Sequence, residues 1–328
     1  ERVSFVRFGL AASAAGPLRQ LGRSLRRLRA LRSTIRRLRP DIVISFLTKV
    51  NVLTLLATRG LAIPVIVSER NNPRRQAANP AWNMAIAALY PQADAIVMQS
   101  EASLACLPRR TRHKAVVIPN PIATRPSCAR PAESRVIAAV GRLCAQKGFD
   151  LLLPAFARAA ADHPEWQLVI WGEGPDRAAL AAQIQSLGLD GRVEMPGLSR
   201  DPGGWVEGTG LFVLSSRYEG FPNALGEAMQ AGLPVIAFDC DFGPAGMLSH
   251  EVDGLLVPAE NIEALAAALE RLMLDPALRS RLGMAARGSS ARFDPLRIIE
   301  QWSKTIGSIP AIGGCFKIDP IRAASQTH

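Results

Sequence analysis

The sequence predicts an α/β protein with two domains, each formed by a doubly wound parallel sheet. Three observations support this fold class. The 328 residues are enough for two domains. Short apolar runs typical of buried parallel strands recur along the chain, and helix-forming runs separate them. Residues 133–292 hold about six such strand–helix units, and the N-terminal part holds fewer.

The first expected helix covers residues 17–39. Its apolar residues step by three and four, which places them along one face. They are Leu18, Leu21, Leu25, Leu28, Leu31, Ile35 and Leu38. The other positions include nine arginines and no acidic residue. Two interpretations stay open. The helix packs on its sheet with a solvated cationic face, or that face also contacts anionic lipid headgroups, at about 1 kcal/mol per charge.

Four short strands are expected after this helix. They lie near residues 41–47, 64–68, 94–100 and 115–118. The longest apolar stretch, Leu53 to Val67, is interrupted by Arg59 and Pro64, so no run is long enough to span a bilayer.

A proline-rich stretch at residues 119–131 has little periodicity and is typical of a linker. We therefore assign residues 1–130 to an N-terminal domain and residues 131–292 to a C-terminal domain. Residues 293–306 form a final helix. The tail, residues 307–328, shows no periodicity and is expected to be irregular.

The first loop of the C-terminal domain carries two cations. An apolar strand runs into Gly141, Arg142 and Lys147 follow on the loop, and Gly148 opens the next helix. Glycine permits a tight turn. Arginine can hold phosphate oxygens in a bidentate manner, and lysine adds a point charge. The alternative is two solvated cations on an ordinary loop.

Three later loops repeat this order of strand, loop and helix. The segment QLVIWGEGPDRAAL places Gly172 to Pro175 after a strand, although Gly-Glu-Gly alone also fits a structural turn. The segments GRVEMPGLSRD and AGLPVIAFDCDFGP give two more strand ends. In such sheets, ligands bind at the carboxyl ends of the strands.

Residues 214–231, LSSRYEGFPNALGEAMQA, carry the most informative pattern in the chain. Glu219 follows an apolar strand, and Glu227 lies about one turn into the next helix. Both carboxylates can therefore face one crevice. The N–H groups of Asn223, Ala224 and Leu225 at the helix N-terminus are suited to an anion such as phosphate. A surface pair of glutamates is the alternative.

These segments together resemble a retaining glycosyltransferase of family 4, the group 1 type, over roughly residues 35–306. The most specific part is SSRYEGFPNALGEAMQAGLPVIAFD, supported by GRLCAQKG and GEGP. DIVISFLTKVNVL, IPVIVSERN and VIPNPI resemble the bacterial members that build surface polysaccharides or lipid-linked oligosaccharides. The resemblance implies a GT-B fold, with two Rossmann-like domains and the donor and acceptor cleft between them. It also implies that the final helix crosses back to the N-terminal domain.

The resemblance implies a hexosyl- or N-acetylhexosaminyltransferase. Such an enzyme moves a sugar from a nucleotide-diphosphate donor, here expected to be UDP-linked, to a hydroxyl of a lipid-linked saccharide. Arg142 and Lys147 would clamp the diphosphate, Glu227 would bind the ribose, and Glu219 would contact the donor sugar. The backbone of residues 221–225 would cradle sugar and phosphate. The rest of the donor-binding set is Gly141, Gly172, Gly197, Leu198, Gly220, Phe221, Pro222, Asn223, Ala224 and Leu225, with Gly197 and Leu198 near the base.

No metal and no cofactor is expected beyond the nucleotide-sugar co-substrate. Family members work without a metal, and two fixed cations with a helix N-terminus can offset the charge of the leaving group. The only Asp-x-Asp sequence, Asp239-Cys240-Asp241, is interpreted as a loop beside the donor.

Two features depart from the family pattern. Relatives carry Arg-Glu after a Gly-Pro, whereas here Ala245 and Gly246 follow Gly243-Pro244, which removes a charged pair near the donor pocket. The chain also opens at Glu1 without the strand and glycine-rich loop of the family, so we expect the N-terminal domain to be truncated. Two alternatives therefore stay open: a truncated, non-catalytic remnant that binds nucleotide sugar, and a GT-B sugar-nucleotide epimerase.

The positive charge is concentrated in the N-terminal part. Residues 1–130 hold 22 Lys and Arg against 5 Asp and Glu, a net of +17, and the remainder holds 17 against 23, a net of −6. This asymmetry favours an anionic membrane surface as a partner. Nucleic acid is not expected, because no aromatic residue interleaves the arginines of the first helix. The five scattered cysteines suit a reducing compartment. We expect a cytoplasmic protein at the inner face of the membrane.

Overall fold

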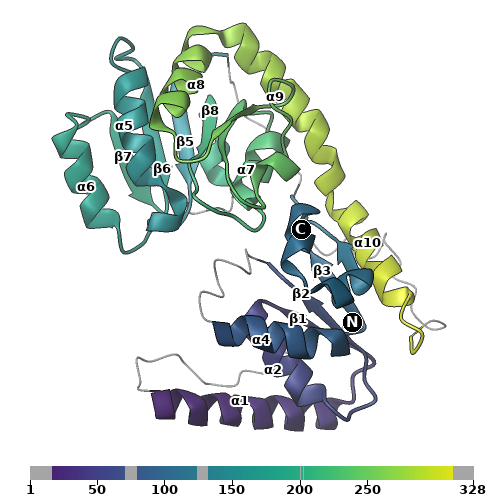
Figure 1. Ribbon diagram of the computed structural model, residues 1–328. Helices are drawn as coiled ribbons and strands as arrows, with labels where there is room; N and C mark the ends of the chain where they lie inside the picture. The colour runs from purple at the N-terminus through teal and green to yellow at the C-terminus, as the bar shows by residue number, and fades with distance from the viewer. Residues whose placement is uncertain (1–16, 71–79, 124–131, 200, 202, 313–328) are drawn as a thin grey trace. The chain divides into compact units, whose positions relative to one another are not determined.

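A computed structural model describes residues 17–70, 80–123, 132–199, 201 and 203–312 (Figure 1). The chain divides into two compact units. Of the described residues, the N-terminal unit takes in 17–70, 80–98, Leu104–Val117 and 302–312, and the C-terminal unit takes in Gln99–Ser103 and those between Ile118 and Gln301. After a first short segment at Gln99–Ser103, the chain returns to the C-terminal unit at Ile118, before the predicted boundary at residues 130 and 131. Residues 124–131 of the predicted linker and most of the predicted tail lie outside the described residues.

The N-terminal unit is built on a four-stranded parallel sheet in the order β1-β2-β3-β4. Its strands are β1 (Val43–Phe46), β2 (Val65–Ser68), β3 (Ala95–Met98) and β4 (Ala115–Val117). Its helices are α1 (Pro17–Leu38), α2 (Thr48–Thr58) and α4 (Pro80–Leu89), with short 3₁₀ turns η1 (Tyr90–Gln92) and η3 (Arg109–Lys114). The four strands fall where the apolar runs predict them.

The core of the N-terminal unit joins its sheet to α2 and α4. Every residue of β2 and β3 is buried, as expected for the inner strands of a parallel sheet. Val67 and Ile96 pack in one cluster with Leu55 of α2 and Ile86 of α4. The two helices are thus held to the sheet by apolar side chains.

A polar network is buried at the carboxyl end of β2. Glu69, only 2% exposed, accepts hydrogen bonds from the Tyr90 hydroxyl, from Thr48 Oγ1 at 2.8 Å and from Asn51 Nδ2 at 3.3 Å. Burial raises the pKa of the Glu69 carboxyl, and these hydrogen bonds oppose the rise. The network holds α2 and η1 against the end of β2.

Helix α1 buries only part of its apolar stripe. Ile35 is 5% exposed, whereas Leu25 is 45% and Leu38 is 59% exposed. Arg32 donates to two carbonyl oxygens at the C-terminal end of α2, at 2.6 and 2.8 Å. Leu25 and Leu38 of the apolar face are thus exposed rather than packed, and Arg32 is a structural contact. The side chains of residues 17–21 and 23 lie outside the described part.

The C-terminal unit holds a six-stranded parallel sheet in the order β10-β9-β8-β5-β6-β7 (Figure 1). The strands are β5 (Val136–Val140), β6 (Gln167–Trp171), β7 (Val193–Gly197), β8 (Leu211–Leu214), β9 (Val235–Asp239) and β10 (Leu255–Pro258). The helices are α5 (Phe149–Ala159), α6 (Arg177–Ser186), α7 (Asn223–Gln230), α8 (Ile262–Leu274), α9 (Pro276–Ser290) and α10 (Pro295–Gly307). Short 3₁₀ turns are η4 (Ala145–Lys147), η5 (Gly204–Val206), η6 (Pro244–Gly246) and η7 (Ala291–Phe293). The turn η2 (Ala102–Cys106) begins in the C-terminal unit and ends in the N-terminal unit.

Both faces of this sheet are covered. Alternate residues of β8 enter two different clusters: Val213 packs with α5, α6 and α8, whereas Phe212 packs with α7. Period-two alternation into two apolar layers is the pattern of a doubly wound sheet. The predicted fold class is therefore present in the C-terminal unit, with β5 between β6 and β8.

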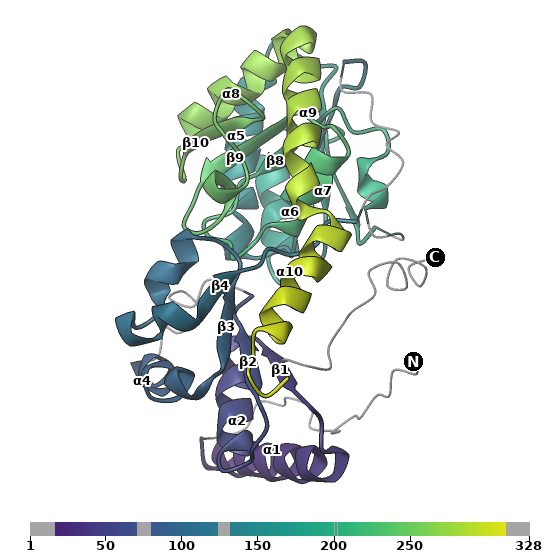
Figure 2. The same ribbon diagram turned by 90° about the vertical axis from the view of Figure 1, so that its right-hand side faces the viewer.

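Helix α10 carries the chain from one unit to the other (Figure 2). Its residues up to Gln301 belong to the C-terminal unit, and those from Trp302 belong to the N-terminal unit. Within the N-terminal unit, the Trp302 ring lies 6.1 Å from the Phe46 ring. The Arg70 guanidinium lies 5.0 and 5.6 Å from the Phe46 and Trp302 ring centroids. Among the described residues, none of the helices is both long and apolar enough to cross a bilayer.

Candidate functional site

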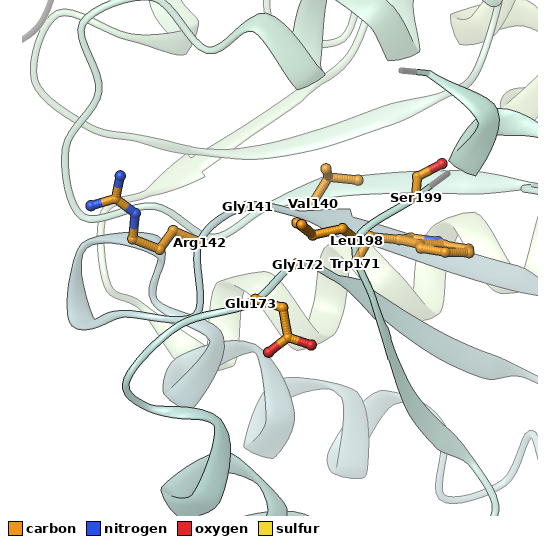
Figure 3. A pocket seen from close by; sticks show the side chains of 8 residues that line it. All are labelled: Val140, Gly141, Arg142, Trp171, Gly172, Glu173, Leu198 and Ser199. Carbon is orange, nitrogen blue, oxygen red and sulfur yellow. The ribbon is translucent and has the colours of Figure 1, made fainter. Parts of the chain in front are cut away.

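A pocket opens at the carboxyl ends of three neighbouring strands of the C-terminal unit (Figure 3). Its volume is about 350 Å³, within the range for small-molecule sites. It is lined by Val140, Gly141, Arg142, Trp171, Gly172, Glu173, Leu198 and Ser199. The strand order reverses between β5 and β8, the switch point where such sheets bind ligands, so the β5 end of the pocket borders that point.

Glycines bring the three strand ends together. Gly141 N–H donates to the Trp171 carbonyl at 2.9 Å, and Gly172 N–H donates to the Gly197 carbonyl at 2.8 Å. Gly172 has φ +144°, and a Cβ atom there would lie 1.8 Å from the Gly141 carbonyl oxygen. A side chain at this position would force the strand ends apart. The predicted Gly141 and Gly172 line the pocket, and Gly197 is hydrogen-bonded to Gly172 without lining it.

Arg142 and the apolar wall lie on opposite sides of this pocket. Figure 3 shows the Arg142 side chain at one side, with the Trp171 indole and Ser199 at the other. Arg142 is exposed, and Leu198 is 73% exposed. The pocket thus offers a cation and a flat apolar surface to one ligand.

Lys147 and Glu219 form an ion pair. Lys147 Nζ lies 2.6 Å from Glu219 Oε1, and Ser216 Oγ donates to the same oxygen at 2.7 Å. Glu219 is only 5% exposed. The sequence treats Lys147 as a partner of the diphosphate and Glu219 as a partner of the sugar. The structure brings the two side chains together. A bound anion would therefore either bind the Lys147 ammonium alongside Glu219 or replace the Glu219 carboxylate as its partner.

Helix α7 starts directly after the buried residues 220–222. Leu225 N–H donates to the Pro222 carbonyl at 3.0 Å. Of the three N–H groups expected to bind an anion, the one of Leu225 is thus already used. Asn223 and Ala224 occupy the first two positions of the helix, where N–H groups have no partner within the helix. Phe221 packs edge-on against Phe293, with 5.3 Å between ring centroids.

Glu227 is held by a residue that the sequence analysis did not identify. Trp205 Nε1 donates to Glu227 Oε2 at 3.0 Å. Trp205 is 3% exposed and packs 5.2 Å from the Phe212 ring. It belongs to η5, after β7, and only the fold brings it to α7. The indole therefore fixes the orientation of the carboxylate.

Gly243, which precedes the two departing residues Ala245 and Gly246, lies close to Glu219. A Cβ atom on Gly243 would stand 3.1 Å from Glu219 Cβ and 3.3 Å from Cys240 Sγ. Ala245 and Gly246 are exposed. Burial, and then the charge of Glu219, raise the pKa of the Cys240 thiol to about 12, so this thiol is not an activated nucleophile. Within the described part of the chain, no three His, Cys, Asp or Glu residues are grouped as metal ligands would be.

Two family models match the chain. The model for glycosyl transferases group 1 matches residues 123–289, and the model for glycosyltransferase family 4 matches residues 9–125. The chain belongs to the group 1 glycosyl transferases. This confirms the family indicated by the sequence motifs, and the first model covers all residues of the pocket and the ion pair.

Similar proteins include bacterial enzymes of polysaccharide and glycolipid assembly. An exopolysaccharide phosphotransferase of Streptomyces coelicolor is 38% identical over 221 residues, which cover 65% of this chain and 23% of that protein. An N-acetylgalactosamine-N,N'-diacetylbacillosaminyl-diphospho-undecaprenol 4-alpha-N-acetylgalactosaminyltransferase of Campylobacter jejuni is 27% identical over 272 residues, which cover 79% of this chain and 74% of that enzyme. The chain spans about half the length, or less, of the first four curated relatives it matches.

The fold is shared with solved structures. The crystal structure of Anabaena Alr3699/HepE in complex with UDP-glucose matches with a TM-score of 0.75 at 22% identity, covering 89% of this chain and 84% of that one. The likeness confirms the predicted GT-B fold with its two parallel sheets.

Proposed function

We propose that the chain is a glycosyltransferase that acts in the assembly of a bacterial surface polysaccharide. It takes a sugar from a nucleotide-diphosphate donor, UDP-linked in the first instance, and passes it to a hydroxyl of a lipid-linked saccharide. One observation carries the proposal. The pocket with Arg142, the Lys147–Glu219 pair and Glu227 all lie on loops and one helix that follow strands of the same sheet. The names of the relatives and the UDP-glucose bound by the structural neighbour support it.

The pocket suits the nucleoside. Trp171 and Leu198 offer apolar surface to a base. Glu227 is the acceptor for the ribose hydroxyls, and Trp205 orients its carboxylate. Arg142 binds the diphosphate. Lys147 and Glu219 lie between phosphate and sugar, so the cation meets the leaving diphosphate and the carboxylate meets a sugar hydroxyl.

The chemistry requires the bond between the anomeric carbon and the diphosphate oxygen to break. The leaving diphosphate gains negative charge, which Arg142, Lys147 and the first N–H groups of α7 stabilise. The acceptor oxygen forms the new bond and loses its proton. In a retaining reaction the leaving phosphate takes that proton on the same face of the sugar. Glu219 Oε1 is already bonded to Lys147 and Ser216, which suits a positioning group rather than a covalent nucleophile.

The reaction is proposed to need no metal. Arg142 and Lys147 supply the positive charge that a divalent ion would otherwise bring to the diphosphate. Transfer measured in EDTA should therefore equal transfer measured in magnesium. Loss of activity on chelation, with recovery on adding magnesium or manganese, would contradict this prediction.

The proposed lipid-linked acceptor and the proposed location at the membrane rest on the basic helix α1 of the N-terminal unit. The exposed arginines of α1 are proposed to hold the protein on the anionic inner face of the cell membrane, where a lipid-linked acceptor is available. The protein would then be a cytoplasmic, peripherally bound enzyme.

Thermal unfolding with a panel of nucleotide sugars tests the proposal. A ligand at 100 times its dissociation constant stabilises a protein by about 2.7 kcal/mol. Ligands that stabilise are then assayed with lipid-linked and free saccharides. Transfer confirms the glycosyltransferase, and interconversion of the donor without an acceptor indicates an epimerase. Binding without turnover indicates a non-catalytic remnant, for which Ala245 and Gly246 in place of the charged pair of the family are the observation in favour.

A further inference from the structure

Two loops of the donor site are joined by Arg217. The first loop, residues 144–150, follows β5, and the second, residues 215–219, follows the neighbouring strand β8. Arg217 Nη1 donates to the Ala145 carbonyl at 2.7 Å. Its two terminal nitrogens donate to both carboxylate oxygens of Asp150, at 2.8 and 2.7 Å, and Nε donates to Glu260 at 3.0 Å. One guanidinium thus binds four oxygens, three in residues 144–150 and one on Glu260.

Three further hydrogen bonds join the same two loops. Arg217 N–H donates to the Gln146 carbonyl at 2.8 Å, and Gln146 Nε2 donates to the Tyr218 carbonyl at 3.0 Å. Ser215 Oγ donates to the Lys147 carbonyl at 2.9 Å. Lys147 is therefore fixed from both sides, and Glu219 is only two residues beyond Arg217. The 2.6 Å contact between Lys147 and Glu219 depends on how these two loops are joined.

We propose that Arg217 is a positioning residue for sugar transfer. It does not line the pocket; it fixes the two loops so that the Lys147 ammonium and the Glu219 carboxylate meet at the junction of diphosphate and sugar. The effect on turnover rests on the proposed function, whereas the effect on the ion pair does not. A guanidinium is required because its planar fork binds Ala145 and both oxygens of Asp150 together, which a lysine ammonium cannot do.

The first experiment follows Lys147 without any ligand. An amine-reactive reagent labels the protein, and mass spectrometry gives the labelling rate of Lys147. We expect a several-fold faster rate in Arg217→Gln, because a shifted loop loosens the pair with Glu219, and an intermediate rate in Arg217→Lys. Arg271→Gln is the matched control. Arg271 forms a two-nitrogen contact with Glu251 elsewhere in the same unit, so its loss tests general destabilisation. Equal Lys147 rates in all variants and the wild type would overturn the proposal.

The second experiment uses UDP and uridine as probes, by calorimetry, with turnover measured in parallel. Arg217→Gln should weaken UDP binding and leave uridine binding unchanged, because the nucleoside pocket lies outside the two loops. A misplacement near 1 Å costs on the order of 100-fold in rate, so kcat should fall far more than the donor KM rises. Arg217→Lys should recover part of kcat. A variant with altered Lys147 labelling but unaltered UDP affinity and kcat would overturn the catalytic part of the proposal. Altered labelling in a protein whose wild type binds no nucleotide would support the loop-positioning role and refute the proposed function.

Discussion

Lys147 and Glu219 are 72 positions apart in the chain and share a contact of 2.6 Å. The sequence singles out each of them, because each follows an apolar strand and carries a charge. Their pairing depends on β5 and β8 being neighbours, which no local pattern encodes. The ion pair shows that Lys147 and Glu219 are partners of each other in this structure. In the absence of ligand the buried carboxylate of Glu219 is compensated by Lys147, as a buried charge requires.

Arg142 tests the diphosphate assignment. Arg142→Ala should weaken binding of a nucleotide diphosphate by about 1.5–3 kcal/mol, the range for a hydrogen bond to a charged group. Binding of the bare nucleoside should hardly change, and calorimetry with both ligands measures the difference. Arg135→Ala is the control. Arg135 does not line the pocket, and its Nη1 lies 3.1 Å from Glu165 Oε1 in an exposed ion pair. Equal losses for both ligands would show that Arg142 does not bind phosphate.

The two glutamates should differ in effect. Glu227→Gln should weaken nucleotide and nucleotide-sugar binding alike, because its proposed partner is the ribose. Glu219→Gln should leave nucleotide binding intact and lower turnover, because its proposed partner is the sugar. Titrations and steady-state kinetics separate the two effects. If both variants gave one profile, the division of roles between Glu219 and Glu227 would have to be abandoned.

At the scale of elements, the strands are well predicted and the connections between loops are not. Apolar runs identify the strands, because buried parallel strands need side chains of that kind on both faces. Arg217 and Ser216 lie inside the most informative segment, yet both look like ordinary loop residues in the sequence. The role of Arg217 comes from Asp150, which only the neighbouring loop supplies. Ser216 bonds to Glu219 within its own loop. Trp205 gives no sequence signal at all, because its partner lies on another element.

The junction of the two loops makes Gly148 a sensitive position. Gly148 has φ +63°, and a Cβ atom there would lie 2.0 Å from the Ser215 carbonyl oxygen. Gly148→Ala should therefore destabilise the protein by more than the roughly 1 kcal/mol of the backbone conformation alone, because the loops must also separate. Chemical denaturation gives this free energy of unfolding. Gly188→Ala is the control, since Gly188 has φ +65° and open space around it. Similar losses for both variants would show that the contact with Ser215 is unimportant.

Helix α1 provides the test for membrane binding. Arg26, Arg29, Arg36 and Arg37 are exposed. Changing all four to Gln should remove up to about 4 kcal/mol of attraction to anionic vesicles at low salt, at about 1 kcal/mol each. Sedimentation with anionic and neutral vesicles measures binding. Binding should weaken as salt rises, because the Debye length, about 8 Å at physiological ionic strength, shortens further. The control replaces four exposed arginines of the C-terminal unit, namely Arg135, Arg158, Arg281 and Arg297. Equal binding to both kinds of vesicle would exclude the electrostatic role.

At the scale of the whole molecule, the sequence predicts the fold class and the uneven charge, but not the limits of the units. The change from net +17 to net −6 is visible in the chain because charge is a property of composition. The limits of the units depend on which residues pack together. The segment Gln99–Ser103 belongs to the C-terminal unit although it directly follows β3 of the N-terminal unit, and no compositional change marks it.

The strand order of the C-terminal sheet has a consequence for synthesis of the chain. One edge of β5 pairs with β6 soon after it, whereas the other edge pairs with β8, with Ile137 opposite Leu211. Until β8 leaves the ribosome, β5 has an open edge that can pair with other chains. A fragment that ends before Leu211 should therefore aggregate, although it contains every residue that lines the pocket. The residues that line the pocket are thus synthesised before β8, the strand that covers the second edge of β5.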